Sequence, residues 1–131
     1  MTYKKISVLV CTRKRLSFLS KMLESYNATV VNPDQAEIIF RCDNDDKETI
    51  EFICGTPHKI IIGPRAEGYK SLPSFYNEIA RIAKGDILIC CNDDVIFMTM
   101  NWPALILEEA CKYPDGIFNL GVNVGLNDDN F

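Results

Sequence analysis

The sequence has no long hydrophobic segment, no excess of basic residues and no paired cysteine motif. The first apolar run, Ile6–Cys11, is far too short for a signal peptide or a membrane span. A formal net charge of -4 and a pI near 4.9 argue against a general nucleic-acid-binding protein, because phosphate contacts need a basic surface. The sequence therefore predicts a chain with no membrane segment and no nucleic-acid partner.

The cysteines number six, yet none forms a Cys-x-x-Cys pair. Most lie within or at the ends of apolar runs, as Cys42, Cys90 and Cys91 do. We therefore expect buried free thiols rather than a zinc site or a disulfide framework, and this usage favours a cytoplasmic location. The single histidine, His58, precedes a predicted strand, and we expect it on a surface loop.

The chain of 131 residues, 47% hydrophobic and 24% charged, has enough apolar material for one globular domain with its own core. Apolar, often β-branched runs alternate with stretches whose apolar residues recur every three to four positions, which is typical of strands alternating with helices. The predicted strands are Ile6–Cys11, Glu37–Cys42, Lys59–Ile62, Asp86–Cys91 and, as a fifth, Ile117–Leu120. The predicted helices lie around Leu16–Tyr26, Ile50–Ile53, Leu72–Ile82 and Pro103–Tyr113.

This alternation predicts an α/β fold with a mostly parallel sheet and helices on both faces, because right-handed crossovers leave few other arrangements. Gly85 is interpreted as the stop signal of the third helix. Trp102 is interpreted either as a core residue or as a lid over a site.

Polar segments follow each predicted strand, where ligands bind in parallel sheets. These segments are Cys11–Arg13, Cys42–Asn44, Gly63–Ser71 and Asn92–Asp94, and we expect all four to line one edge. Neighbouring carboxylates raise each other's cost of ionisation, so Asp93 and Asp94 indicate a cation beside them. The alternative for Asn92–Asp94 is a polar turn that caps the next element.

The order of these segments resembles family 2 of the glycosyltransferases, which have the GT-A (Rossmann-like) fold. The resemblance spans nearly the whole chain and is most specific in A-K-G-D-I-L-I-C-C-N-D-D. It implies one nucleotide-sugar-binding domain over residues 1–131, truncated before the acceptor-binding half. It also implies glycosyl transfer from a nucleoside diphosphate sugar, a UDP-sugar first, to an unknown acceptor with Mn²⁺ or Mg²⁺. The catalytic base is expected in a later segment, so no catalytic residue is assigned.

The resemblance also implies site residues. The metal would be held by Asp94, with Asp93 beside it, and Asp43 would accept a hydrogen bond from the base. The implied nucleotide-binding residues are Cys11, Thr12, Arg13, Arg15, Asp43, Arg65, Lys70, Asn92 and Asp93.

The first loop and Asn92 depart from the family pattern. The first loop keeps Thr12 and Arg15 but lacks the family's proline, tyrosine and asparagine, and Asn92 replaces a common aspartate. The acidic run Asp43–Asp46 could equally cap a helix.

Two alternatives remain open at this point: a non-catalytic nucleotide-binding domain and a receiver-like signalling domain. The length and the parallel sheet fit a receiver. A receiver's phosphoacceptor pocket, however, needs acids after the first strand, where this chain has Thr12–Arg15.

Overall fold

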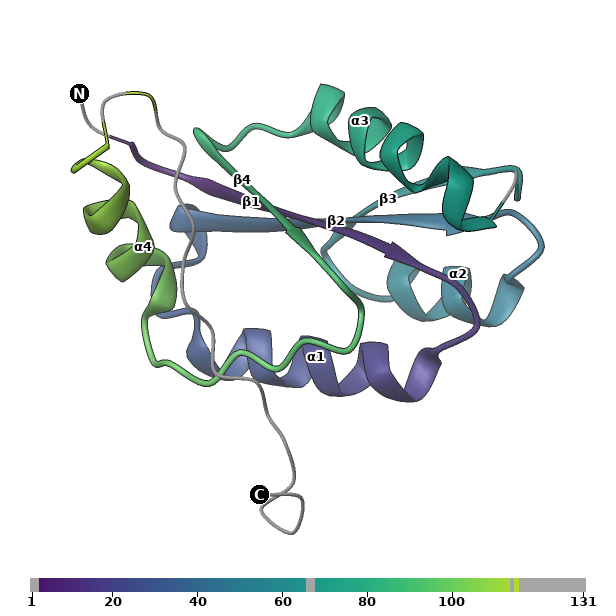
Figure 1. Ribbon diagram of the computed structural model, residues 1–131. Coiled ribbons are helices and arrows are strands. Elements are labelled where there is room, and N and C mark those ends of the chain that lie inside the picture. Colours follow the sequence, from purple (N-terminus) through teal and green to yellow (C-terminus); the bar gives the residue numbers. More distant parts are fainter. Residues whose placement is uncertain (1–2, 66–67, 114, 116–131) are drawn as a thin grey trace, which may run out of the picture.

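The computed structural model describes residues 3–65, 68–113 and 115. Within these residues four strands form one sheet: β1 (Ile6–Thr12), β2 (Ala36–Asp43), β3 (Lys59–Gly63) and β4 (Ile87–Cys91). The helices are α1 (Leu16–Thr29), α2 (Lys47–Cys54), α3 (Leu72–Ile82) and α4 (Trp102–Ala110), with short 3-10 helices η1 (Pro33–Gln35) and η2 (Gly68–Ser71). Each pair of neighbouring strands is parallel, which confirms the predicted fold class (Figure 1).

The strand order excludes the receiver-like alternative. Receiver domains have the flavodoxin-like order 2-1-3-4-5, in which the second strand lies at an edge. Here the order is β3-β2-β1-β4, so that β2 lies between β1 and β3. This is the 3-2-1-4 order of the other doubly wound class, whose ligands also bind at the carboxyl ends of the strands.

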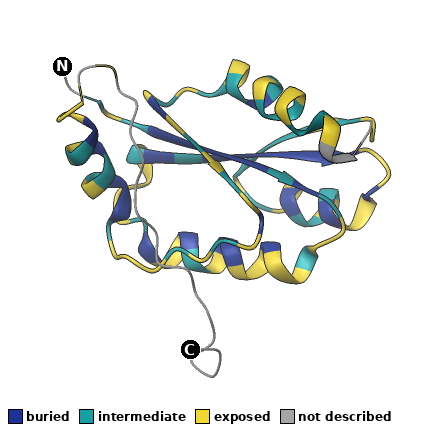
Figure 2. Ribbon diagram, viewed as in Figure 1, coloured by how far each residue is buried: buried dark blue, intermediate teal, exposed yellow. Residues whose placement is uncertain are grey.

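Helices cover both faces of the sheet, with α3 on one face and α1, α2 and α4 on the other (Figure 1). Alternate residues of β1 and β2 point to opposite faces, and both strands are almost entirely buried (Figure 2). The larger apolar cluster joins Val8 and Val10 to Leu19 and Met22 of α1. The smaller cluster, under α3, contains Leu9, Ile39 and Ile79.

Strand β4 is less buried than its apolar sequence predicts. Leu88 is 46% exposed and Cys90 is also exposed, because β4 pairs with β1 on one side and with no other strand in the described part of the chain. The predicted fifth strand, Ile117–Leu120, lies outside the described residues. The described cysteines are all free, but only Cys42 is buried and Cys54, Cys90 and Cys111 are exposed, so the prediction of buried thiols was wrong for those three.

Gly85 has a different role from the one predicted. Helix α3 ends at Ile82 and Ala83 is already extended, so Gly85 is not the residue that terminates the helix. Its backbone N–H donates to Ser7 Oγ at 2.7 Å, and a Cβ at this position would lie 2.5 Å from the backbone nitrogen of Ser7. Glycine is therefore required by the close approach of two backbone segments.

His58 lies in the loop before β3, as predicted, but is only partly exposed, whereas Trp102 is buried. The His58 ring lies 5.5 Å from that of Tyr26, and burial lowers the pKa of its imidazole. Trp102 is buried and its Nε1–H donates to Thr29 Oγ1 at 3.0 Å, so it is a core residue and not a lid. Within residues 3–65 and 68–113, no helix is both long and apolar enough to span a bilayer.

Candidate functional site

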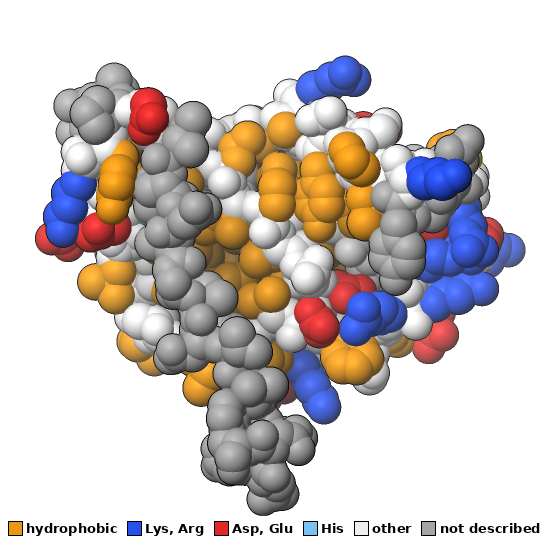
Figure 3. Space-filling view, in the orientation of Figure 1, with side chains coloured by type: hydrophobic (Ala, Val, Ile, Leu, Met, Phe, Trp, Pro, Cys, Tyr) orange, Lys and Arg blue, Asp and Glu red, His pale blue; other side chains and the backbone are white. Residues whose placement is uncertain are grey.

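Charged side chains concentrate at the edge of the sheet where β1 and β2 end. Figure 3 shows Lys and Arg side chains gathered there with acidic side chains among them. Because Thr12 is in register with Cys42, the loops after β1 and β2 begin side by side, and Val10 in register with Cys91 brings the loop after β4 next to them. The parallel sheet therefore assembles the candidate site from segments far apart in sequence.

The first group at this edge joins β1 to the loop after β4. Asp93 is buried and its Oδ2 accepts a hydrogen bond from Thr12 Oγ1 at 3.0 Å. Arg15 Nη1 lies 3.4 Å from Asp93 Oδ1, and Arg15 Nη2 lies 3.6 Å from Asp94 Oδ2. Burial raises the pKa of Asp93, although Thr12 and Arg15 oppose that rise. The two acids predicted to attract a cation thus have the Arg15 guanidinium between them.

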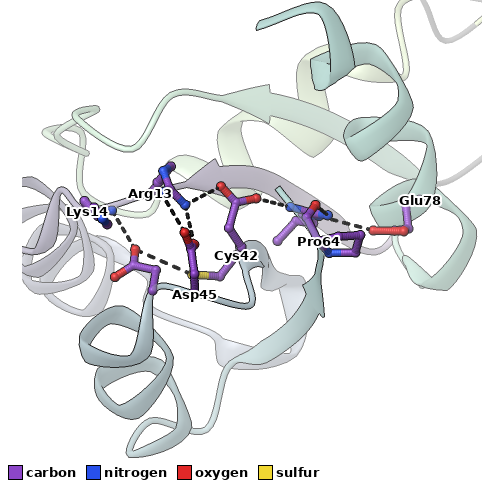
Figure 4. Close-up of polar contacts among 9 residues, drawn as sticks. Arg13, Lys14, Cys42, Asp45, Pro64 and Glu78 are labelled. Carbon is purple, nitrogen blue, oxygen red and sulfur yellow. Dashed lines mark hydrogen bonds and ion pairs between the residues drawn. The ribbon is translucent and has the colours of Figure 1, made fainter. Parts of the chain in front are cut away.

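The second group joins the loop after β1 to the end of β2 (Figure 4). Arg13 Nη1 donates to Asp43 Oδ2 at 2.9 Å, and the same guanidinium holds both oxygens of Asp45. The hydrogen bonds from Arg13 hold the pKa of the Asp45 carboxyl below its usual value. Asp43 is the last residue of β2 and not a helix cap, which removes the alternative interpretation for this residue.

Asp46 occupies the N-cap position of α2, yet its carboxylate also ties down the first loop. Its Oδ2 accepts the backbone N–H of Lys14 at 2.6 Å (Figure 4). Burial alone would raise the pKa of Asp46, but this hydrogen bond and others lower it. Lys14 has a φ of 49°, a left-handed conformation that costs energy for a residue with a Cβ. The contact with Asp46 helps to hold the loop in that conformation.

A shallow hollow of about 350 Å³ lies between these two loops. It is lined by Lys14, Leu16, Asp45, Asp46, Lys47, Glu48 and Thr49. The hollow adjoins the site, but Arg13, Asp43 and Asp93 are not among its lining residues.

The remaining predicted residues are Arg65, Lys70, Asn92 and Cys11. Arg65 and Lys70 lie on the segment after β3, are exposed, and make no ion pair with a described residue. Asn92 is exposed beside Asp93. The Cys11 side chain packs in the smaller apolar cluster, and burial raises the pKa of its thiol to about 12.

Sequence analysis missed Arg41, whose guanidinium pairs with Asp43 Oδ1 from inside the protein. Arg41 is 3% exposed and donates from Nη2 to the Pro64 carbonyl at 2.8 Å (Figure 4). A signal was present, since an arginine interrupts the otherwise apolar strand I-I-F-R-C. A cation inside a buried strand needs a buried partner.

The donor set fits a metal that is shared with a ligand. Within the described residues, no three His, Cys, Asp or Glu side chains converge on one point. Mg²⁺ is usually bound through one or two protein carboxylates, with phosphates and water completing its shell. Asp94, with the neighbouring Asp93, can supply that number, so these residues fit an ion held together with a diphosphate.

A family model described as glycosyl transferase family 2 matches residues 7–130. The chain belongs to glycosyl transferase family 2. No match is found among curated proteins. The family's GT-A fold is that of the described sheet and helices, which confirms the family and fold predicted from sequence.

Solved structures of this fold are similar to the family 2 chain over most of its length. Staphylococcus aureus TarS 1-349 is 15% identical with a TM-score of 0.61, over 82% of this chain and 33% of that one. TarS 1-349 in complex with UDP-GlcNAc has a TM-score of 0.61 at 16% identity, over 82% and 32%. The mannosyltransferase PcManGT from Pyrobaculum calidifontis, in complex with GDP-Man and Mn²⁺, has a TM-score of 0.56 at 14% identity, over 73% and 29%. This chain thus spans about a third of the length of these structures.

Proposed function

We propose that this family 2 chain binds the donor of a glycosyl transfer reaction, a nucleoside diphosphate sugar, together with Mn²⁺ or Mg²⁺. The observation that carries the proposal is the convergence of Arg13 with Asp43, and of Arg15 with Asp93 and Asp94, at the carboxyl edge of the sheet. Membership of the family supports it. The complexes of TarS with UDP-GlcNAc and of PcManGT with GDP-Man and Mn²⁺ are consistent with such a donor.

Each residue has a role that follows from its chemistry. Asp43 Oδ2 accepts the ring N–H of uracil or guanine, and we place a UDP-sugar first. Arg15 and the exposed Arg65 and Lys70 offer cations to the diphosphate, with Arg15 beside the acid pair. Asp94, assisted by Asp93, would hold the metal. A bound divalent metal stabilises the negative charge that develops on the departing diphosphate.

Hydrogen bonds within the chain already hold several of these groups in position without a ligand. Thr12 fixes one oxygen of the buried Asp93, and the Lys14 N–H fixes the loop after β1 against Asp46. Groups that are already in place lose little conformational freedom on binding. Complete transfer to an acceptor is proposed for the whole protein, with the acceptor site and the catalytic base supplied by a further segment, in keeping with the share of the TarS structure that this chain covers.

A thermal-unfolding screen tests the donor site. UDP, GDP, CDP and ADP are each added with Mn²⁺, with Mg²⁺ or with a chelator, because a ligand that binds only the folded state raises its melting temperature. We expect UDP to raise it by several degrees with a metal and far less with the chelator. Asp94→Asn should lose the metal-dependent part. Equal shifts with and without metal in both proteins would remove the metal role.

A separate transfer assay tests whether this chain alone has transferase activity or only binds the nucleotide. Incubation with radiolabelled UDP-sugars, Mn²⁺ and a panel of sugar, lipid and peptide acceptors should give at most slow donor hydrolysis from this chain alone. Acceptor-dependent product that Asp94→Ala abolishes would show that this chain already holds a catalytic base. No binding of any nucleoside diphosphate would overturn the proposed function.

A further inference from the structure

A buried cation lies directly behind the carboxylate proposed to bind the base. Arg41 of β2 is almost completely removed from solvent, although its guanidinium carries a full charge. Its Nη1 pairs with Asp43 Oδ1, its Nη2 donates to the Pro64 carbonyl at 2.8 Å, and its Nε points to Glu78 Oε1 at 3.4 Å. Burying a charge is costly unless its hydrogen bonds are made, so this set of partners specifies one position for the guanidinium.

The residues around Arg41 also fit its guanidinium in this one position. The guanidinium carbon lies 3.7 Å from the ring centre of Phe75, on α3. On the other side, Gly63 at the end of β3 leaves space, because a Cβ there would lie 2.6 Å from Arg41 Nη2. The end of β3, the helix α3 and the end of β2 thus all contact one side chain.

The two oxygens of Asp43 have unequal partners. Oδ1 is held by the buried Arg41, whereas Oδ2 is held by Arg13, which is partly exposed and also binds Asp45. Asp45 itself is exposed, so Arg13 can exchange partners at the surface while Arg41 cannot. Arg41 therefore fixes the plane of the Asp43 carboxylate and leaves Oδ2 as the oxygen that faces a ligand.

We propose that Arg41 is a positioning residue that gives the nucleotide site its base selectivity. A carboxylate held in one orientation accepts a hydrogen bond from a ring N–H, as uracil has, and repels the unprotonated ring nitrogen that cytosine presents in its place. A carboxylate free to rotate discriminates less, because water or Arg13 can shield it. This inference rests on the proposed function, since it concerns the same site.

The experiment measures the affinities for UDP and CDP by calorimetry, with Mn²⁺, in the parent chain and in four variants. Arg41→Met removes the buried cation. Gly63→Ala keeps every charge and displaces the guanidinium, which is the movable end of a long side chain. Gly55→Ala is the matched control, because its Cβ would meet its nearest atoms at an ordinary 3.5 Å. Lys59→Met removes a cation from the other end of the sheet, where Lys59 pairs with Glu37.

We expect Arg41→Met to weaken UDP binding roughly tenfold and CDP binding much less, so that the UDP:CDP ratio falls. Gly63→Ala should lower the ratio in the same direction, and both controls should keep the parent ratio. Circular dichroism checks folding, and Gly63→Ala carries the test where Arg41→Met melts below the assay temperature. A parent-like ratio in Gly63→Ala, or in folded Arg41→Met, would overturn the positioning role. A parent chain that binds neither nucleotide would overturn the proposed function itself.

Discussion

The two ends of the parallel sheet both carry polar clusters, but they differ in how much of each cluster a ligand can reach. At the amino end, Glu37 accepts hydrogen bonds from Ser7 Oγ at 2.5 Å, the Lys84 backbone N–H at 2.7 Å and Lys59 Nζ at 2.8 Å. The Glu37 side chain is only 9% exposed. At the carboxyl end, Arg13 and Arg15 are 24% and 44% exposed, which is similar to the 41% of Lys59 at the amino end. The difference lies in the acids, because Asp45 and Asp94 at the carboxyl end are 51% and 47% exposed.

The two ends of the sheet do not differ in the volume of the hollow found at each. A hollow of about 360 Å³ near the amino end has almost the same volume as the one of about 350 Å³ at the carboxyl end. The first is lined by Tyr3, Lys4, Gln35, Leu107, Glu108 and Cys111. The second is lined by Lys14, Leu16 and residues 45–49. The difference is that the amino-end charges satisfy one another, whereas the carboxyl-end charges can also serve a ligand. Stability is the expected role of the first cluster, and binding is the added role of the second.

The largest effect is expected from Asp43→Ala, which should damage folding as well as binding. From the sequence alone, we expect Asp43 to bind the base and its loss to have little effect on folding. The structure corrects this, because the substitution leaves the buried Arg41 without its carboxylate, at a cost of about 3–5 kcal/mol in the free energy of unfolding. Urea unfolding measures that loss, and calorimetry with UDP measures the weaker binding. An unchanged urea midpoint would show that Arg41 does not depend on Asp43.

Lowering the pH should destabilise the protein through the amino-end cluster, whose expected role is stability alone. Burial raises the pKa of Glu37, but the hydrogen bonds from Lys59, Ser7 and Lys84 outweigh it and bring the pKa from 4.5 to about 2. A carboxyl whose pKa is lowered on folding stabilises the protein above its unfolded pKa, and that contribution disappears as the pH falls from about 4.5 towards 2. We expect it to be about 2–3 kcal/mol at neutral pH.

Urea unfolding of the parent and of Glu37→Gln from pH 7 to pH 2 measures this contribution. The two stabilities should differ most at neutral pH and converge in acid, while the UDP affinity at neutral pH stays equal. If the free energies of unfolding of the parent and of Glu37→Gln differed by the same amount at every pH, the lowered pKa of Glu37 would not be the source of the stability. A weaker UDP affinity in folded Glu37→Gln would contradict the conclusion that the amino-end cluster contributes to stability and not to binding.

Gly85→Ala should destabilise the amino end by steric conflict. The new methyl would press on the backbone of Ser7, and such overpacking costs about 1–3 kcal/mol. The melting temperature should fall while the UDP affinity of the folded protein stays constant. Gly55→Ala, with ordinary contacts, serves as its control. A parent-like melting temperature would mean that the two segments separate easily.

The smallest effect is expected from Arg15→Gln. Removing the cation between Asp93 and Asp94 should strengthen binding of Mn²⁺ in the absence of nucleotide, by the roughly 0.2–1 kcal/mol typical of an exposed ion pair. Electron paramagnetic resonance of free Mn²⁺ measures this affinity, with Lys112→Gln, which breaks a distant surface pair, as control. Weaker Mn²⁺ binding in Arg15→Gln would contradict the idea that Arg15 and a metal compete for the acid pair.

Much of this arrangement can be read from local sequence, because it depends on periodicity and on the polar residues directly after each strand. The apolar run before Asn92 predicts β4, and the parallel alternation predicts that Thr12, Asp43 and Asp93 meet at one edge. The predictions that failed depend on contacts between distant segments. The exposure of Leu88 results from the position of β4 at the edge of the described sheet, and no local pattern encodes it.

Arg41 and Gly85 show the same limit more sharply. An arginine within an apolar strand indicates that it has a buried partner. The local sequence does not predict that Arg41 contacts Phe75, Pro64 and Asp43, which lie on three different segments. A glycine after a helix, such as Gly85, is usually interpreted as the residue that ends the helix. Here glycine is required because the backbone of Ser7, which is distant in sequence, lies too close for a Cβ. Such roles appear only once the chain is folded.

Nuclear magnetic resonance of the ¹⁵N-labelled chain, titrated with UDP and Mg²⁺, tests the central claim most directly. Amide signals from residues 12–15, 43–46 and 93–94 should move with saturating ligand, because these segments form the carboxyl edge. Signals from residues 5–7, 36–38 and 84–87, around the Glu37 cluster, should stay in place. Shifts confined to the amino-end residues, or no shifts with any nucleoside diphosphate, would contradict the account.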